Sequence, residues 1–199
     1  MAIRYSFILI PDPAFLRVIH TARQILCNQF GCWTAEMFML HMPLIQYFEE
    51  QSVINIERSD VIINALNNYS NFEWEMAPQE ITISDGPPYD LKIKCKDIVG
   101  GPFNSLRTDL AQQFNLKGIN PEYSPCIQLL ENFETNTNII EEAYEMAKDL
   151  FDNFGLDTPF ALKTLQLVKY ESKLAGENWE QKHWSSDISW DILDSFRLR

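Results

Sequence analysis

Hydrophobic and polar positions along the chain predict short strands that alternate with amphipathic helices. Runs rich in β-branched and aromatic residues, or a strict two-residue alternation, predict strands, and apolar positions three and four apart predict helices. The clearest alternation places Leu91, Ile93 and Cys95 on one face and Lys92 and Lys94 on the other. The predicted strands cover residues 5–10, 37–45, a short segment around 81–83, 90–97, 123–130 and 160–170, with one more strand near the C-terminus. The predicted helices cover about 13–30, 56–69, 103–114 and 139–154.

The first predicted helix has clear signals at both ends. Asp12 is placed to accept hydrogen bonds from the first helical N–H groups, and Pro13 suits the first helical position. Gly31 follows the last apolar position, where a left-handed residue commonly ends a helix. This helix therefore follows directly on the first strand.

A strand–helix–strand unit occurs twice in the sequence. Shifting the chain by 85 residues lays the segment 41–49, HMPLIQYFE, over the segment 126–134, CIQLLENFE. Leu44 then meets Leu129, and Phe48 meets Phe133. The repeat predicts two lobes related by a pseudo-twofold axis, with His41 and Pro43 from one lobe and Cys126 and Gln128 from the other directed toward one groove. Residues two apart on a strand face the same side.

The composition is that of a folded domain. Apolar residues make up 46% of the 199 residues, which is enough for a substantial core. We expect one bilobal domain over residues 1–199. No apolar run approaches the length of about 18 residues that crosses a bilayer, so no membrane association is expected. The N-terminal segment is interpreted as a strand rather than a signal peptide.

Charge and cysteine usage narrow the range of partners. The net charge of −12 repels phosphate backbones, so binding to duplex nucleic acid is not expected. The four cysteines form neither a CxxC pair nor a Cys/His set with zinc spacing, so we expect no metal or other cofactor and interpret them as reduced thiols of a cytoplasmic protein. We expect a monomer.

The layout resembles that of the 2H phosphoesterases, which include RNA 2′,3′-cyclic phosphodiesterases and the so-called 2′-5′ RNA ligases. The resemblance rests on the first strand YSFILIP, the segment HMPL at His41, the strand DLKIKCKD, and Pro125 directly before Cys126. It covers nearly the whole chain, including the strand FALKTLQLVKYE. It implies an α+β fold of two pseudo-symmetric lobes, each a mainly antiparallel sheet with helices packed outside, around a central groove.

The resemblance also implies chemistry, and the sequence departs from it. The family carries two H-x-T/S motifs, in which two histidines act as general base and general acid on a phosphodiester and two hydroxyls bind its oxygens. Here His41 matches the first histidine, but Pro43, Cys126 and Gln128 replace the other three residues. Pro43 cannot donate a hydrogen bond, whereas the amide of Gln128 can. Losing one acid–base group costs roughly 10²–10⁴-fold in rate.

We therefore predict a protein that acts on or binds a small phosphodiester, such as a 2′,3′-cyclic phosphate or a short RNA end, with weak or lost catalysis. The candidate catalytic residues are His41 and Cys126, and the candidate ligand contacts are Gln128, Pro43, Tyr5 and Lys163. Non-functional roles remain open: His41 as a hydrogen-bonded groove residue without chemistry, Cys126 as a packed thiol, and the lysines as solvated side chains. The alternative function is a non-catalytic binding or regulatory module that uses the groove for a protein or metabolite.

Overall fold

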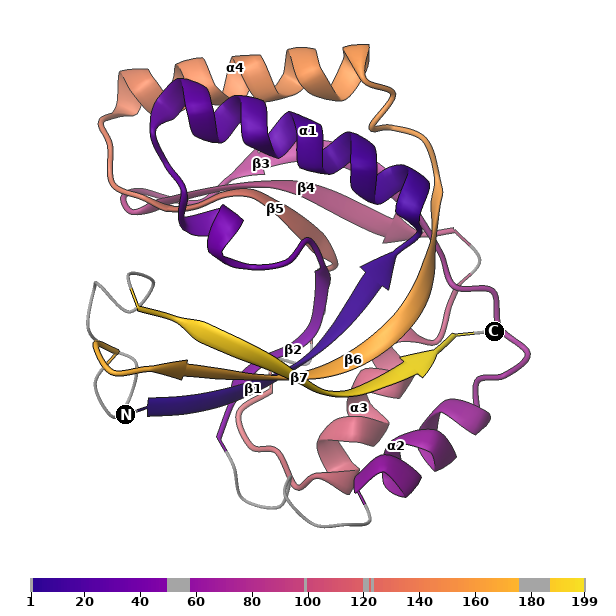
Figure 1. Cartoon of the computed structure of the whole chain (residues 1–199). Coiled ribbons are helices and arrows are strands. Elements are labelled where there is room, and N and C mark those ends of the chain that lie inside the picture. Colours follow the sequence, from indigo (N-terminus) through magenta and orange to yellow (C-terminus); the bar gives the residue numbers. More distant parts are fainter. Residues whose placement is uncertain are drawn as a thin grey trace.

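A computed structural model describes residues 2–49, 58–98, 100–119, 122, 124–175 and 187–198. Seven strands and four α-helices alternate along these residues, with one short 3₁₀ helix, η1 (Figure 1). The strands are β1 (Ala2–Pro11), β2 (Met42–Phe48), β3 (Glu75–Ile83), β4 (Tyr89–Asp97), β5 (Cys126–Phe133), β6 (Phe160–Ser172) and β7 (Ser189–Arg197). The helices are α1 (Pro13–Phe30), η1 (Thr34–Met37), α2 (Arg58–Asn67), α3 (Phe103–Gln113) and α4 (Thr137–Asn153).

The predicted signals at the two ends of α1 are confirmed. Asp12 Oδ1 accepts hydrogen bonds from the backbone N–H groups of Ala14 and Phe15, at 2.9 and 3.1 Å. The other oxygen of Asp12 accepts from the N–H of Ala161 at 3.1 Å, which ties the helix start to β6. Gly31 ends the helix with a φ of 67°, a conformation that glycine adopts without steric cost.

The strands form one strongly curled antiparallel sheet in the order β2-β1-β6-β3-β4-β5, and β7 pairs with β6 beside this path. The long strand β6 belongs to both halves. Its first residues pair with β3, and the rest of the strand pairs with β1 and β7. The sheet therefore folds into a half built from β1, β2, β6 and β7 and a half built from β3, β4 and β5, which we call the first and second lobes.

Helices cover the outer faces of both lobes. Figure 1 shows α1 and α4 side by side over β3–β5, and α2 with α3 beneath the first lobe. Two helices pack against the lobe other than that of the strand they follow. Helix α1 follows β1 but packs against β5. Helix α3 follows β4, but its Arg107 side chain donates a hydrogen bond to the Leu44 carbonyl of β2 at 3.1 Å. One continuous core, which contains Phe7, Leu91 and Leu110, runs through both lobes. The predicted α+β class with two lobes and outer helices is confirmed.

The two lobes repeat the same strand register. The paired residues of β4 and β5 correspond to those of β1 and β2. The shift is 84 residues from β1 to β4, the leading strands, and 85 residues from β2 to β5, the following strands. The pairs are Tyr5–Phe48, Phe7–Ile45, Ile8–Pro43 and Leu9–Met42 in the first lobe, and Tyr89–Phe133, Leu91–Leu130, Lys92–Gln128 and Ile93–Ile127 in the second. The sequence comparison aligned Ile8 with Ile93, whereas the register aligns Ile8 with Lys92.

A backbone irregularity also recurs in both lobes. Tyr47 and Asn132, 85 positions apart, have φ values of 52° and 53°. The N–H of Tyr47 donates to Ser6 Oγ, and the N–H of Asn132 donates to Asp90 Oδ1, each at 3.0 Å. Such a bulge leaves one residue without a ladder partner, and in both lobes a side chain on the neighbouring strand accepts the freed hydrogen bond.

Several sequence predictions differ from the structure. The strand predicted for residues 37–45 begins only at Met42, because Thr34–Met37 forms the 3₁₀ helix. Simple alternation along residues 37–45 predicts that Ile45 shares a face with Pro43, but Ile45 lies opposite the core residue Phe7. The bulge between the Phe7 and Ile8 pairs causes this change, since one inserted residue reverses the alternation of faces. The sequence also predicts a loop with Trp179 and Trp184 before the last strand, and these two residues lie outside the described residues.

Candidate functional site

The inner face of the first lobe carries a small apolar cluster. Ile8 of β1 and Val168 and Tyr170 of β6 pack there with Phe38 and Ile188, separately from the main core. Ile8 lies opposite Pro43, so Pro43 shares this inner face. The inner strand face of this lobe is therefore mainly hydrophobic.

The segment 34–41, which consists of η1 and the residues that connect it to β2, lies between the two lobes; we call it the connector. Buried Arg23 of α1 fixes it by donating to Glu36 Oε1 at 2.5 Å and to the Phe38 carbonyl at 2.7 Å. The Phe38 ring then packs edge-on against Tyr170, with centroids 5.6 Å apart. On the other side, η1 contacts β5 of the second lobe. This connector occupies part of the space that the sequence analysis assigned to a groove.

His41 is the last residue of the connector and directly precedes Met42, the first residue of β2. Its side chain is half-buried, and Nδ1 lies 2.7 Å from the Met39 carbonyl, so Nδ1 carries the proton that it donates. The pKa of His41 is lowered to about 4, mainly by burial and also by the Arg23 guanidinium, whereas the Met39 hydrogen bond opposes the change. At neutral pH the imidazole is uncharged. It has no spare proton to donate as an acid and is a weak base.

The second lobe offers a polar face at the corresponding positions. Cys126 is half-buried at the start of β5, and burial raises the pKa of its thiol, an effect that nearby Lys92 partly opposes. Gln128 follows on the same face and lies directly opposite Lys92 of β4. The Gln128 Oε1 atom is buried and accepts no hydrogen bond from the described residues. A buried amide oxygen without a donor is costly unless water or a ligand satisfies it.

Glu131 is an important residue that the sequence analysis missed. Its pKa is raised to about 7, mainly by burial and also by the charge of Asp90, whereas Arg23 and Lys92 oppose the change. Lys92 Nζ lies 4.0 Å from Asp90 Oδ2. On the first lobe, burial raises the pKa of Tyr47, and the charge of Glu131 adds to this effect. The bulge explains why Glu131 was missed, because it breaks the two-residue alternation after Gln128.

The predicted site residues lie in different surroundings. Cys126, Gln128 and Pro43 lie on inner strand faces, but Tyr5 is entirely buried in the main core with its ring stacked on Phe48 at 6.0 Å. Lys163 is exposed and lines a different hollow of about 780 Å³ beside α2 and β7. Neither His41 nor Cys126 lines that hollow, nor the two of about 600 and 420 Å³ elsewhere on the surface.

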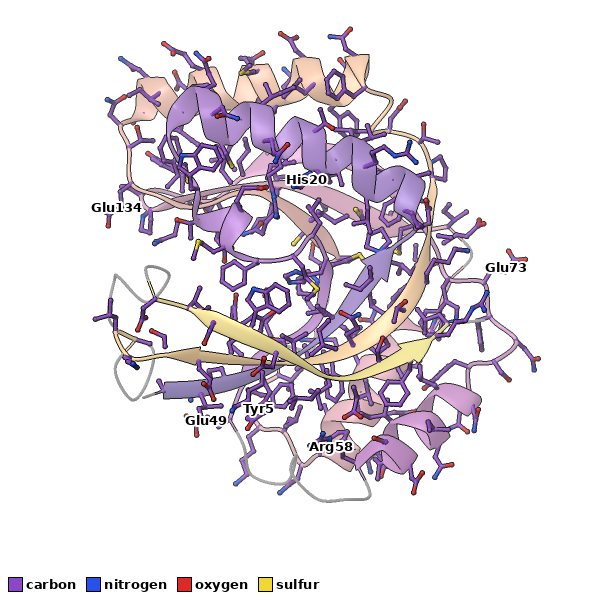
Figure 2. All side chains as sticks on the ribbon, in the orientation of Figure 1. Tyr5, His20, Glu49, Arg58, Glu73 and Glu134 are labelled. Carbon is purple, nitrogen blue, oxygen red and sulfur yellow. The ribbon has the colours of Figure 1, made fainter. Side chains whose placement is uncertain are left out.

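The described ranges hold no cluster of three or more His, Cys, Asp or Glu side chains suited to a metal ion. Figure 2 places the exposed carboxylates Glu49, Glu73 and Glu134 around the periphery of the molecule, and His20 at the surface of α1. Among the described helices, none is both long and apolar enough to cross a membrane. These three carboxylates therefore lie on the outside, whereas Glu36 of the connector and Glu131 of β5 are half-buried.

Comparison with known proteins identifies the fold. No protein family and no curated protein matches the sequence. A conserved protein of unknown function from Agrobacterium tumefaciens matches the structure with a TM-score of 0.57 and 11% identity, over 84% of this chain and 80% of that one. A Thermus thermophilus protein, TT0787, matches with a TM-score of 0.53 and 12% identity over 98% of both chains. Escherichia coli LigT, solved with phosphate, matches with a TM-score of 0.50 and 10% identity over 98% of this chain and 96% of that one.

The curled antiparallel sheet, the repeated register and these neighbours define a two-lobed fold of the 2H phosphoesterase type. The resemblance noted in the sequence is thereby confirmed at the level of the fold. Sequence identities of 10–12% support a shared architecture but assign no catalytic residue to this chain.

Proposed function

We propose that this protein binds a small phosphate-bearing nucleotide or RNA end between its lobes and has weak or no phosphodiesterase activity. The likeness to LigT, a structure with bound phosphate, supports a small anionic ligand. The observation that carries the proposal is the contrast between the two lobes. The first presents Ile8 and Pro43, whereas the equivalent pair in the second is Lys92 and Gln128.

This contrast favours binding over turnover. A two-histidine mechanism needs a proton acceptor on one side of the phosphorus and a proton donor on the other. His41 has a pKa of about 4 and its Nδ1 is engaged with Met39, and burial raises the pKa of the Cys126 thiol above its ordinary value. Lys92 and the Gln128 amide N–H can still hold a phosphate oxygen. We also propose that the two lobes arose from an internal repeat and act as one domain in the cytoplasm.

Glu131 gives the proposed binding a pH dependence. Because its pKa is about 7, this side chain is largely neutral at pH 6 and largely ionised at pH 8. An ionised Glu131 repels a phosphate held by Lys92. Relative to Glu131→Gln, the affinity of the wild type for a nucleoside monophosphate should therefore fall as pH rises from 6 to 8, because this comparison cancels the second ionisation of the phosphate itself.

The test combines binding and turnover. Calorimetric titration with a nucleoside 3′-monophosphate should give weaker binding for Lys92→Ala and Gln128→Leu, while Lys163→Ala, which removes an exposed lysine elsewhere, should match the wild type. Hydrolysis of a nucleoside 2′,3′-cyclic phosphate should be near background, and equal in His41→Ala. Cys126→His combined with Pro43→Thr should restore turnover if the two strands keep the required geometry. No binding by the wild type, or equal binding by all variants, would refute the proposal.

The connector supports a second candidate function, a non-catalytic module whose groove accepts a protein or metabolite. Phe38 fills part of the apolar face of the first lobe and is held there by Arg23. In that case nucleotides should not bind, and the Cys126→His, Pro43→Thr double variant should remain inactive.

A further inference from the structure

A separate cavity of about 600 Å³ lies between α1, the connector and the strands β6 and β7. This volume lies within the range of small-molecule sites. Much of its lining is apolar and includes Ile10, Leu16, Phe38 and Leu40. Neither Gln128, Lys92 nor Cys126 lines it, so it differs in its residues from the site proposed above.

Gln166 lines this cavity and carries a hydrogen-bond acceptor without a partner among the described residues, which a small rotation of its amide can present to a ligand. The strand register places Gln166 opposite Ile8, on the inner face of the first lobe. Its Oε1 atom is buried and accepts no hydrogen bond from the part of the chain that the structure describes. Its Nε2 atom makes only a long contact of 3.5 Å with Ser195 Oγ. An amide held in this way favours a ligand that carries an N–H or O–H donor.

The cavity also has an excess positive charge at its mouth. Arg17 of α1 is exposed, lines the cavity and forms no ion pair with the described residues. The one carboxylate in the lining, Glu36, is already countered by Arg23 at 2.5 Å and lies 3.4 Å from His20 Nε2. The Arg17 guanidinium is therefore available to an anionic group, to which it can donate two parallel hydrogen bonds.

Trp190 provides a flat surface in the lining. Its side chain is 36% exposed, and its indole N–H donates to the Met37 carbonyl at 3.0 Å. This hydrogen bond fixes the edge of the ring. A fixed indole offers a planar ligand an apolar contact at little cost in conformational entropy.

We propose that this cavity binds a planar heteroaromatic molecule that carries a ring N–H or amino group and a carboxylate or phosphate. The ring packs against Trp190 and the apolar lining, its N–H or amino group donates to Gln166 Oε1, and the anion pairs with Arg17. This inference does not depend on the proposed function, because it uses a different set of residues.

Indole-3-acetate is the first probe, since it carries the ring, the N–H group and a carboxylate but no phosphate. Calorimetric titration at low salt should give a Kd at or below about 1 mM. Arg17→Ala should weaken binding by about 5-fold, less at high salt, and Gln166→Leu by about 5-fold. Lys163→Ala removes an equally exposed cation on another face and should change nothing.

A second arm separates carboxylate from phosphate ligands. Adenosine 5′-monophosphate is titrated into a Gln128→Leu variant, in which the groove site of the proposed function is weakened, with adenosine as the probe without an anion. Binding of either anionic probe that depends on Arg17 and Gln166 supports the inference. Binding of neither probe at about 1 mM, equal affinity for adenosine and its monophosphate, or binding insensitive to both Arg17→Ala and Gln166→Leu would overturn it.

Discussion

Glu131→Gln is the change that most directly tests the electrostatics of the inter-lobe region. The substitution keeps the size of the side chain and removes its capacity to ionise. In the wild type, burial and the neighbouring Asp90 raise the pKa of Glu131 from 4.5 to about 7. The folded protein therefore holds the proton more tightly than the unfolded chain does. Ionising Glu131 must then cost folding free energy.

The magnitude follows from the two pKa values. The difference of roughly 2.5 corresponds to about 3 kcal/mol, since each pKa unit is worth about 1.4 kcal/mol. This cost is absent below pH 4.5, grows as the pH rises from 4.5 to 7, and is constant above pH 7. Because the side chain is only half-buried, we expect Glu131→Gln to raise the free energy of unfolding by about 2 kcal/mol at pH 8, and by much less at pH 5.

Urea unfolding of both proteins at pH 5, 6, 7 and 8 measures this effect. Glu141→Gln is the matched control, because it removes the same charge from an exposed position on α4. The control should change the free energy of unfolding by less than about 0.5 kcal/mol at every pH. An equal effect of Glu131→Gln at pH 5 and pH 8, or a control that matches it, would refute the reasoning. A carbon-13 NMR titration of the Glu131 carboxyl should show its midpoint near pH 7.

Three further predictions address single groups. The pKa of His41 is lowered from 6.5 to about 4, so protonation below pH 6.5 favours the unfolded chain. As the pH falls from 6.5 to 4, the wild type should lose up to about 3 kcal/mol of unfolding free energy relative to His41→Gln. Urea unfolding measures this difference, and stability curves that stay parallel for the two proteins would contradict it. Arg23→Leu should cost about 3 kcal/mol, because it leaves Glu36 and the Phe38 carbonyl without their donor, whereas an unchanged denaturation midpoint would show that the connector is held in some other way. Mild alkylation followed by mass spectrometry should modify Cys126 before the three buried cysteines, and a slower reaction at Cys126 would contradict its partial exposure.

The fold was predictable because its signals are local and strong. The alternation around Leu91 and Ile93 and the capping of α1 by Asp12 each fix an element without knowledge of its neighbours. The repeat offset of 85 then related the following strands of the two lobes correctly. The offset of 84 between the leading strands was not predictable from aligned letters, because it depends on register across the sheet.

The site was less predictable because it depends on long-range contacts. The position of Glu131 follows from a bulge, and the placement of Phe38 follows from a hydrogen bond to Arg23 fifteen residues earlier. Neither feature has a periodic signature. Tyr5 was a candidate for the groove, but the pleat directs it to the opposite face, next to Phe48. Lys163 failed to reach the groove for a similar reason, since it lies in the wall beside α2.

The preserved register makes the chemical difference between the lobes informative. Each bulge keeps its side-chain acceptor, Ser6 in one lobe and Asp90 in the other, so the backbone geometry that directs the inner faces is the same in both. On this common frame, the first lobe presents apolar side chains and the second a lysine, an amide and a titratable carboxyl. A reaction that needs matched acid and base groups on opposite sides gains little from such a frame. A ligand with one polar and one apolar end suits this arrangement, because its polar end can contact the second lobe and its apolar end the first.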